Sequence, residues 1–193
     1  MSFKESISHE EIEELELLSF DGKIEVITDT GAAYKKAIKH LSSCRMIGFD
    51  TETKPVFQHH VPHNPTALLQ LSSETNAYIF RLTKIGMPKE LVKLMTSKTI
   101  TKIGAAVWDD IRGLNHYSHF EAQRFMDLQS FAENYGIKDK SVKKLTAIIL
   151  GRKVSKAQQL SNWESPELTQ AQLLYAATDA WVCLVMYKKL LAS

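Results

Sequence analysis

The stretch MIGFDTET, residues 46–53, decides the fold because it reads as a buried strand whose end carries charge. Strand side chains alternate between the two faces of a sheet, so Asp50 and Glu52 point one way and Thr51 points the other. Two neighbouring carboxylates repel unless a cation lies between them, and such hard oxygen ligands suit Mg²⁺ or Mn²⁺. Taken alone, a strand that runs into a polar loop explains the pattern equally well.

A second pair of polar residues lies in the apolar stretch 173–186, which predicts a deeply packed helix. Tyr175 and Asp179 are four residues apart, so a phenol and a carboxylate share one helical face, one turn apart. A carboxylate on a buried helix needs a partner, and a metal ion is one candidate. An ion pair with a lysine or arginine is the alternative.

A tandem pair of aspartates follows a short strand in KIGAAVWDDIRGL, residues 102–114. The strand is expected to turn at Gly104 and a helix to open near Asp109 and Asp110. Helix starts favour aspartate through their free N–H groups and dipole, so at least one of the pair is expected to be structural.

With these three motifs in order, the chain resembles the DEDD superfamily of 3′–5′ exonucleases. The matching segments are FDTET (49–53), GAAVWDDIRGL (104–114) and YAATDA (175–180), and the resemblance spans residues 24–191. Within the superfamily the chain is most similar to the ribonuclease D and Werner-type exonuclease domains. The Y-x-x-x-D form of the third segment is typical of the tyrosine branch. Three motifs in order are far more specific than any one of them.

The resemblance implies an α/β fold of the ribonuclease-H-like form, a mixed central β-sheet flanked by α-helices. It implies that Asp50, Glu52 and Asp179 hold a first metal ion, and that Asp50 and Asp110 serve a second. A one-residue slip would put Asp109 in place of Asp110. Tyr175 would orient the attacking water, because a phenol with a pKa of about 10 is a poor base at neutral pH.

The implied activity is a 3′–5′ exonuclease that uses two Mg²⁺ or Mn²⁺ ions, roughly 3.5–4 Å apart, to hydrolyse phosphodiester bonds. A catalytically silent nucleic-acid-binding or interaction module of the same fold is the alternative. A metal phosphatase is disfavoured by the Y-x-x-x-D form. The expected partner is a nucleic acid with a free 3′ end. DNA is favoured over RNA, because ribonuclease D enzymes usually carry further helical domains after the nuclease.

Composition is consistent with one domain over residues 1–193, with residues 1–22 as an N-terminal helical extension packed on it. The chain has 193 residues, of which 44% are hydrophobic. No signal pattern or bilayer-length apolar stretch is present, which predicts a soluble cytoplasmic protein with no membrane partner. Cys44 and Cys183 fit no zinc or redox spacing and are expected to be buried free thiols.

Basic residues gather before the third motif, although the formal net charge of the chain is only +2. They are predicted to contact the phosphate backbone, to form a loop over the site or to form a solvated face. The cluster consists of Lys138, Lys140, Lys143, Lys144, Arg152, Lys153 and Lys156. Trp163 is predicted to stack on a base or to pack in the core.

Three histidines, His59, His60 and His63, lie in a proline-flanked loop after the first motif. They are candidates for a transition-metal site or for contact with the substrate. Their spacing lacks the H-E-x-x-H pattern of a helical zinc site, so an exposed loop is the favoured interpretation.

Overall fold

The computed structural model describes residues 3–58, 60 and 63–193, and within them six strands form one mixed sheet. The strand order is β1-β4-β3-β2-β5-β6. β3 runs antiparallel to both β2 and β4, while β1, β5 and β6 run parallel to their neighbours. The strands are β1 Lys23–Ile27, β2 Met46–Thr53, β3 Thr66–Ser72, β4 Asn76–Arg81, β5 Thr101–Gly104 and β6 Phe125–Asp127. The predicted mixed central sheet is confirmed.

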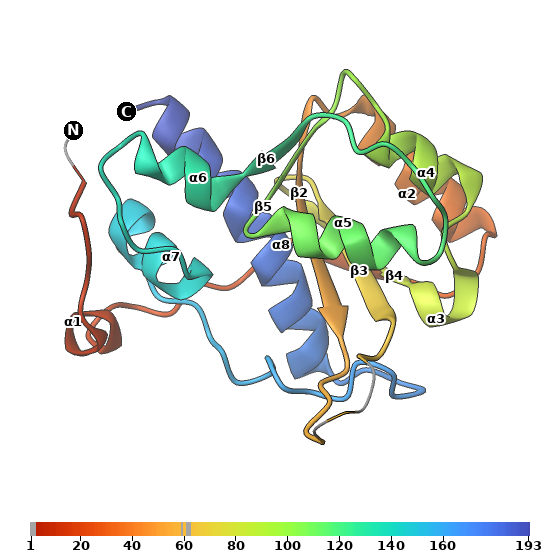
Figure 1. Cartoon of the computed structure of the whole chain (residues 1–193), viewed down its shortest axis with the longest axis horizontal. Coiled ribbons are helices and arrows are strands. Elements are labelled where there is room, and N and C mark those ends of the chain that lie inside the picture. The colour runs from red at the N-terminus through yellow and green to blue at the C-terminus, as the bar shows by residue number, and fades with distance from the viewer. Residues whose placement is uncertain (1–2, 59, 61–62) are drawn as a thin grey trace.

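Helices cover both faces of this sheet (Figure 1). The helices are α1 His9–Glu13, α2 Ala32–Ser43, α3 Leu82–Ile85, α4 Lys89–Met95, α5 Val107–Asn115, α6 Leu128–Glu133, α7 Val142–Leu150 and α8 Gln170–Leu191. On one face, α2, α4 and α5 pack against the apolar side chains of β2, β3 and β4. On the other face, α8 crosses the sheet, and α6 and α7 pack against α8.

The alternation of β2 explains why its two faces differ so strongly. Ile47 and Phe49 are fully buried in the core shared with α2, α4 and α5. The opposite face of the same strand carries Gly48, Asp50 and Glu52, and this face lies towards α8. β2 therefore has an apolar face that stabilises the sheet and a polar face directed at the longest helix.

Gly48 allows α8 to approach β2 closely. A Cβ atom at this position would collide with the carbonyl oxygen of Ala180 and with the hydroxyl of Ser72. Ala180 is itself small and fully buried. A strand glycine commonly marks such a close backbone approach, and here it brings the residue before Ala180, Asp179, next to the end of β2.

Gly48→Ala is expected to lower the free energy of unfolding by about 1–3 kcal/mol, because the added methyl group must push α8 away from β2. Urea denaturation measures the change. Gly31→Ala is the matched control, since a Cβ at Gly31 would meet the flexible side chain of Asp29 rather than backbone. Equal stability of the two variants would contradict the close approach.

Three features of the chain depend on short or irregular segments. α1 ends at Glu13, and Leu17 then pairs with Lys153 as an isolated bridge. Gly31 is the N-cap of α2. β6 and α3 are short elements with weak periodicity, and the sequence analysis does not predict them.

The N-terminal segment packs on the body of the protein near α7. Ile12 of α1 is fully buried and lies in a small apolar cluster with Ala147 of α7. The Leu18 amide donates to the Lys153 carbonyl at 2.7 Å, and the Lys153 amide donates to the Glu16 carbonyl at 3.0 Å. In the part of the chain that is described, no helix has the length and apolar character needed to cross a bilayer.

Candidate active site

Three carboxylates converge where the end of β2 meets α8. Asp50 and Glu52 come from the α8-facing side of β2, and Asp179 comes from the middle of α8. Each offers one oxygen atom, and these three oxygens lie within 4.8 Å of one another. Carboxylate oxygens at such separations are the ligands that Mg²⁺ and Mn²⁺ prefer, so the donor set fits a hard divalent cation.

The electrostatics of the cluster show how strongly these carboxylates disfavour being charged together. Burial, followed by the charge of Glu52, holds the pKa of Asp50 well above its usual value. Burial and then the charge of Asp179 raise the pKa of Glu52 to about 9, and burial raises that of Asp179 to about 7. A cation bound between them would remove this penalty.

Tyr175 lies one turn before Asp179 on α8, as the spacing predicted. Burial, followed by the charges of Asp179 and Glu52, raises the pKa of the phenol above its ordinary value of 10. The hydroxyl therefore stays protonated and acts as a hydrogen-bond donor, which lowers the pKa of Asp179 against the effect of burial. The ring lies beside Trp163, with 5.8 Å between the ring centroids.

The two tandem aspartates of α5 lie in different surroundings. Asp110 is half-buried and accepts a hydrogen bond from the hydroxyl of Thr51, the residue between Asp50 and Glu52. Its negative charge contributes to the raised pKa of both Asp50 and Glu52, and burial raises the pKa of Asp110 itself to about 6. Asp109 is exposed and forms an ion pair with Arg112. Asp110 is thus the member of the pair that belongs to the carboxylate cluster.

Thr51 is a site residue that sequence reasoning missed. Alternation placed its side chain on the opposite face from Asp50, and that is why it meets α5 rather than α8. Asp110 therefore approaches the end of β2 from one face of the sheet while Asp179 approaches from the other. No pattern in the sequence indicated which α5 side chain would meet Thr51.

A groove of about 820 Å³ opens beside Asp110, between the loop after β2 and α5. Its walls carry hydrogen-bonding and basic side chains, among them His63, Asn64, Arg112 and His116. Two aromatic side chains of this loop and helix are exposed: Phe57, 75% exposed in the loop after β2, and Trp108, 58% exposed at the start of α5.

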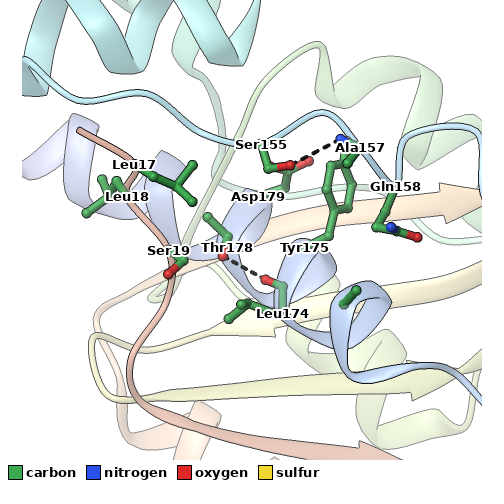
Figure 2. A pocket seen from close by; sticks show the side chains of 11 residues that line it. Leu17, Leu18, Ser19, Ser155, Ala157, Gln158, Leu174, Tyr175, Thr178 and Asp179 are labelled. Carbon is green, nitrogen blue, oxygen red and sulfur yellow. Dashed lines mark hydrogen bonds between the residues drawn. The ribbon is translucent and has the colours of Figure 1, made fainter. Parts of the chain in front are cut away.

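A second, mostly apolar pocket of about 220 Å³ is lined in part by Tyr175 and Asp179 (Figure 2). The N-terminal segment contributes Leu17 to its wall, the loop before α8 contributes Ala157, and α8 contributes Leu174. The Thr178 hydroxyl donates to the Leu174 carbonyl at 2.6 Å and accepts from the Phe20 amide at 3.0 Å. The N-terminal segment thus forms one side of the surroundings of Tyr175 and Asp179.

Most of the basic cluster before α8 is paired with carboxylates, largely those of the N-terminal segment. The pairs are Lys138–Glu5, Lys140–Glu133, Lys143–Glu13, Lys144–Asp139, Arg152–Glu16 and Lys153–Glu13. This arrangement favours a solvated, ion-paired face over a phosphate-binding one for these six residues. Lys156 differs, because its charge lowers the pKa of Asp179.

The remaining candidate residues have mixed outcomes. Trp163 is fully buried, so it packs in the core and does not stack on a base. His59 lies outside the described residues, and the described cluster of possible metal ligands contains neither His60 nor His63. Both cysteines are free, with Cys183 buried and Cys44 half-buried.

Comparison with known proteins adds a family match and several relatives. The model of a family described as 3'-5' exonuclease matches residues 25–193. The chain is 31% identical over 157 residues to the bifunctional 3'-5' exonuclease/ATP-dependent helicase WRN of Mus musculus, covering 78% of this chain and 11% of that protein. It is 32% identical over 155 residues to the exonuclease 3'-5' domain-containing protein 2 of Drosophila melanogaster, covering 78% and 26%.

Among solved structures, RNase D of Trypanosoma brucei, determined in complex with RNA U12, superimposes with a TM-score of 0.79. The match covers 90% of this chain and 64% of that one at 19% identity, so it supports the ribonuclease-H-like fold alone. The chain spans about a tenth and about a quarter of the two sequence relatives described above.

Proposed function

The chain belongs to the 3′–5′ exonuclease family within the DEDD superfamily, and from that premise we propose that it removes nucleotides from the 3′ end of a nucleic acid with two divalent cations. The observation that carries the proposal is the convergence of Asp50, Glu52 and Asp179, whose oxygens lie within 4.8 Å of one another. When bound, Mg²⁺ or Mn²⁺ ions supply Lewis acidity at the scissile phosphate.

The chain's own residues divide into holding and positioning roles. Asp50, Glu52 and Asp179 would hold the first ion, and Asp50 together with Asp110 would hold the second. The Thr51 hydroxyl orients the Asp110 carboxylate through its hydrogen bond. Such an outer hydrogen bond fixes the direction of a metal-binding carboxylate.

Tyr175 is assigned to positioning the attacking water, in keeping with the tyrosine branch of the superfamily. Its raised pKa keeps the phenol protonated at neutral pH, so it can donate a hydrogen bond but cannot take a proton from water. Its place one turn from Asp179 directs this hydroxyl to the carboxylate cluster.

The silent binding module is the less favoured alternative, because a silent member is expected to lack one of the carboxylates or the tyrosine. All of Asp50, Glu52, Asp110, Tyr175 and Asp179 are present and lie around one site. Their burial and then their mutual repulsion raise the pKa values of Asp50 and Glu52 and so disfavour the ionised cluster without a metal ion, and a role in binding alone gives no reason for this placement.

The groove beside Asp110 is the proposed path of the nucleic acid strand towards the site. Arg112 is paired with Asp109 through one guanidinium nitrogen and keeps further N–H groups for phosphate, and the exposed Trp108 of the same helix offers a stacking surface. We propose DNA as the favoured substrate over RNA. Since sugar discrimination depends on contacts near the 2′ position, a direct comparison of both polymers must decide it.

The function is tested with 5′-labelled DNA and RNA oligonucleotides, single-stranded and 3′-recessed, incubated with purified protein in Mg²⁺, Mn²⁺ or EDTA. The expected result is a ladder that shortens from the 3′ end in either metal and is absent in EDTA. Binding without cleavage in every metal would support the silent module instead.

Asp110→Asn is expected to lower exonuclease activity by on the order of 10²-fold, because it removes a charge directed at the site. Asp109→Asn is the matched control: it makes the same chemical change one residue away, on an exposed side chain paired with Arg112. The control is expected to keep activity within about threefold. Rates on a single-stranded oligonucleotide measure both, and the reverse ranking would reassign the second-ion ligand to Asp109.

A further inference from the structure

Gln70 of β3 is a fully buried side chain whose amide has no hydrogen-bond partner. Both its Nε2 and its Oε1 are inaccessible to solvent and unpaired. Leaving a buried amide unpaired costs about 1–3 kcal/mol, so buried amides are nearly always paired in the working state of a protein. A partner for this amide should therefore lie within reach.

The strand register identifies that partner. Gln70 lies directly opposite Asp50 in the antiparallel pair of β2 and β3. Directly opposite side chains point to the same face of the sheet, with Cβ atoms about 4.5–5.5 Å apart. A glutamine side chain is long enough to span this gap, although the amide and the Asp50 carboxylate form no hydrogen bond in this structure.

The strand neighbours of Gln70 offer no comparable group. Leu68 lies opposite Glu52, and Ile79 lies opposite Gln70 on the far side of β3. Ser72 lies opposite Gly48, two residues from Gln70, and its hydroxyl is also unpaired. Asp50 is thus the charged neighbour of Gln70 across the β2–β3 pair.

We propose that Gln70 is a positioning residue whose Nε2 donates a hydrogen bond to one oxygen of the Asp50 carboxylate when Asp50 binds a divalent cation. The bond would fix the orientation of the carboxylate so that its remaining lone pairs face the ion. This inference rests on the proposed function, because it requires the cation. With Gln70 in this role, β3 contributes a residue to the site in addition to those of β2, α5 and α8.

The energetics of the pair support this role. A hydrogen bond to an ionised acceptor is shorter and stronger than one between neutral groups, so an ionised, cation-bound Asp50 suits the amide best. Removing such an outer hydrogen bond typically costs 10–100-fold in metal affinity or activity. A purely structural role would instead affect the stability of the metal-free fold.

The test measures Mn²⁺ binding by calorimetry together with the melting temperature in EDTA for wild type and Gln70→Met, which keeps the volume and removes the amide. Mn²⁺ binding is expected to weaken by about 10–100-fold. The melting temperature in EDTA is expected to stay equal or rise, because an unpaired buried amide is removed. Gln70→Leu serves as a second variant if methionine disturbs the packing.

Ser72→Ala is the matched control, since it removes another buried, unpaired polar group from the same face and strand but opposite Gly48. It is expected to leave Mn²⁺ affinity unchanged. This inference would be overturned, without the proposed function, if Gln70→Met bound Mn²⁺ as tightly as wild type does. The same holds if Ser72→Ala lost as much Mn²⁺ affinity as Gln70→Met. A wild-type protein that does not bind Mn²⁺ would overturn the proposed function and this inference with it.

Discussion

Replacing Asp50 with asparagine is expected to abolish nucleotide release and, at the same time, to raise the melting temperature of the metal-free protein. Activity should fall by on the order of 10³-fold or more, because Asp50 is the one residue proposed to touch both ions. Stability should rise because asparagine has nearly the same shape but no carboxylate to bury and no charge to repel Glu52, Asp110 and Asp179.

The opposite directions of these two changes make the result diagnostic. A variant that is inactive because it is misfolded loses stability, whereas this one should gain it. Asp109→Asn, an exposed change of the same kind, is the control for both measurements. An active Asp50→Asn protein would refute the metal assignment, and a lower melting temperature in EDTA would refute the repulsion between the carboxylates.

The second large effect is expected in the pH dependence of stability without metal. Glu52 and Asp179 have pKa values of about 9 and about 7 in the folded protein, raised from 4.5 and 3.8. The folded state therefore holds protons that the unfolded state releases, and stability falls as pH rises from about 4 to about 9. The melting temperature in EDTA is expected to decline between pH 6 and pH 8.

Between pH 6 and pH 8, other groups with shifted pKa values contribute little to the pH dependence of stability. The ion-paired Glu11 and Glu13 have lowered pKa values, so they are already ionised in both states above pH 6. Above pH 8, Lys102 would add an opposite slope, because burial lowers its pKa to about 8. A slope that persists unchanged in Glu52→Gln, which removes the carboxyl group with the pKa of about 9, would show that the decline has another source.

Mg²⁺ is expected to reverse this decline, because the ion stabilises the ionised carboxylates. At a concentration about 100 times its dissociation constant, a ligand adds about 2.7 kcal/mol, which corresponds to about 5–10 °C for a chain of this size. The gain should be larger at pH 8 than at pH 6, where protons compete with the ion. Scanning calorimetry with Mg²⁺ and with EDTA measures it, and a gain independent of pH would contradict binding at this cluster.

Local periodicity was enough to predict the site residues that share an element. Alternation along β2 placed Asp50 and Glu52 on one face, and the helical repeat placed Tyr175 one turn from Asp179. The order of the three motifs then predicted the superfamily and the mixed sheet, which the family match and the fold confirm.

The parts that were not predicted depend on contacts between distant segments. The resemblance favoured Asp110 over Asp109, but the contact that distinguishes them is a hydrogen bond across 59 residues of sequence. The role of Gly48 depends on the approach of α8, and the pairing of Gln70 depends on the register of β3. The ion pairs between the N-terminal segment and the basic cluster are equally long-range. None of these leaves a periodic signal along the chain.

The most direct test of the central claim is an anomalous diffraction map from crystals of the wild-type protein soaked in Mn²⁺ with a short 3′-hydroxyl oligonucleotide. The proposal predicts two anomalous peaks roughly 3.5–4 Å apart. One should lie among Asp50, Glu52 and Asp179, and the other between Asp50 and Asp110. A fully bound oligonucleotide with no anomalous peak at these carboxylates would contradict the claim that they form the metal site of an exonuclease.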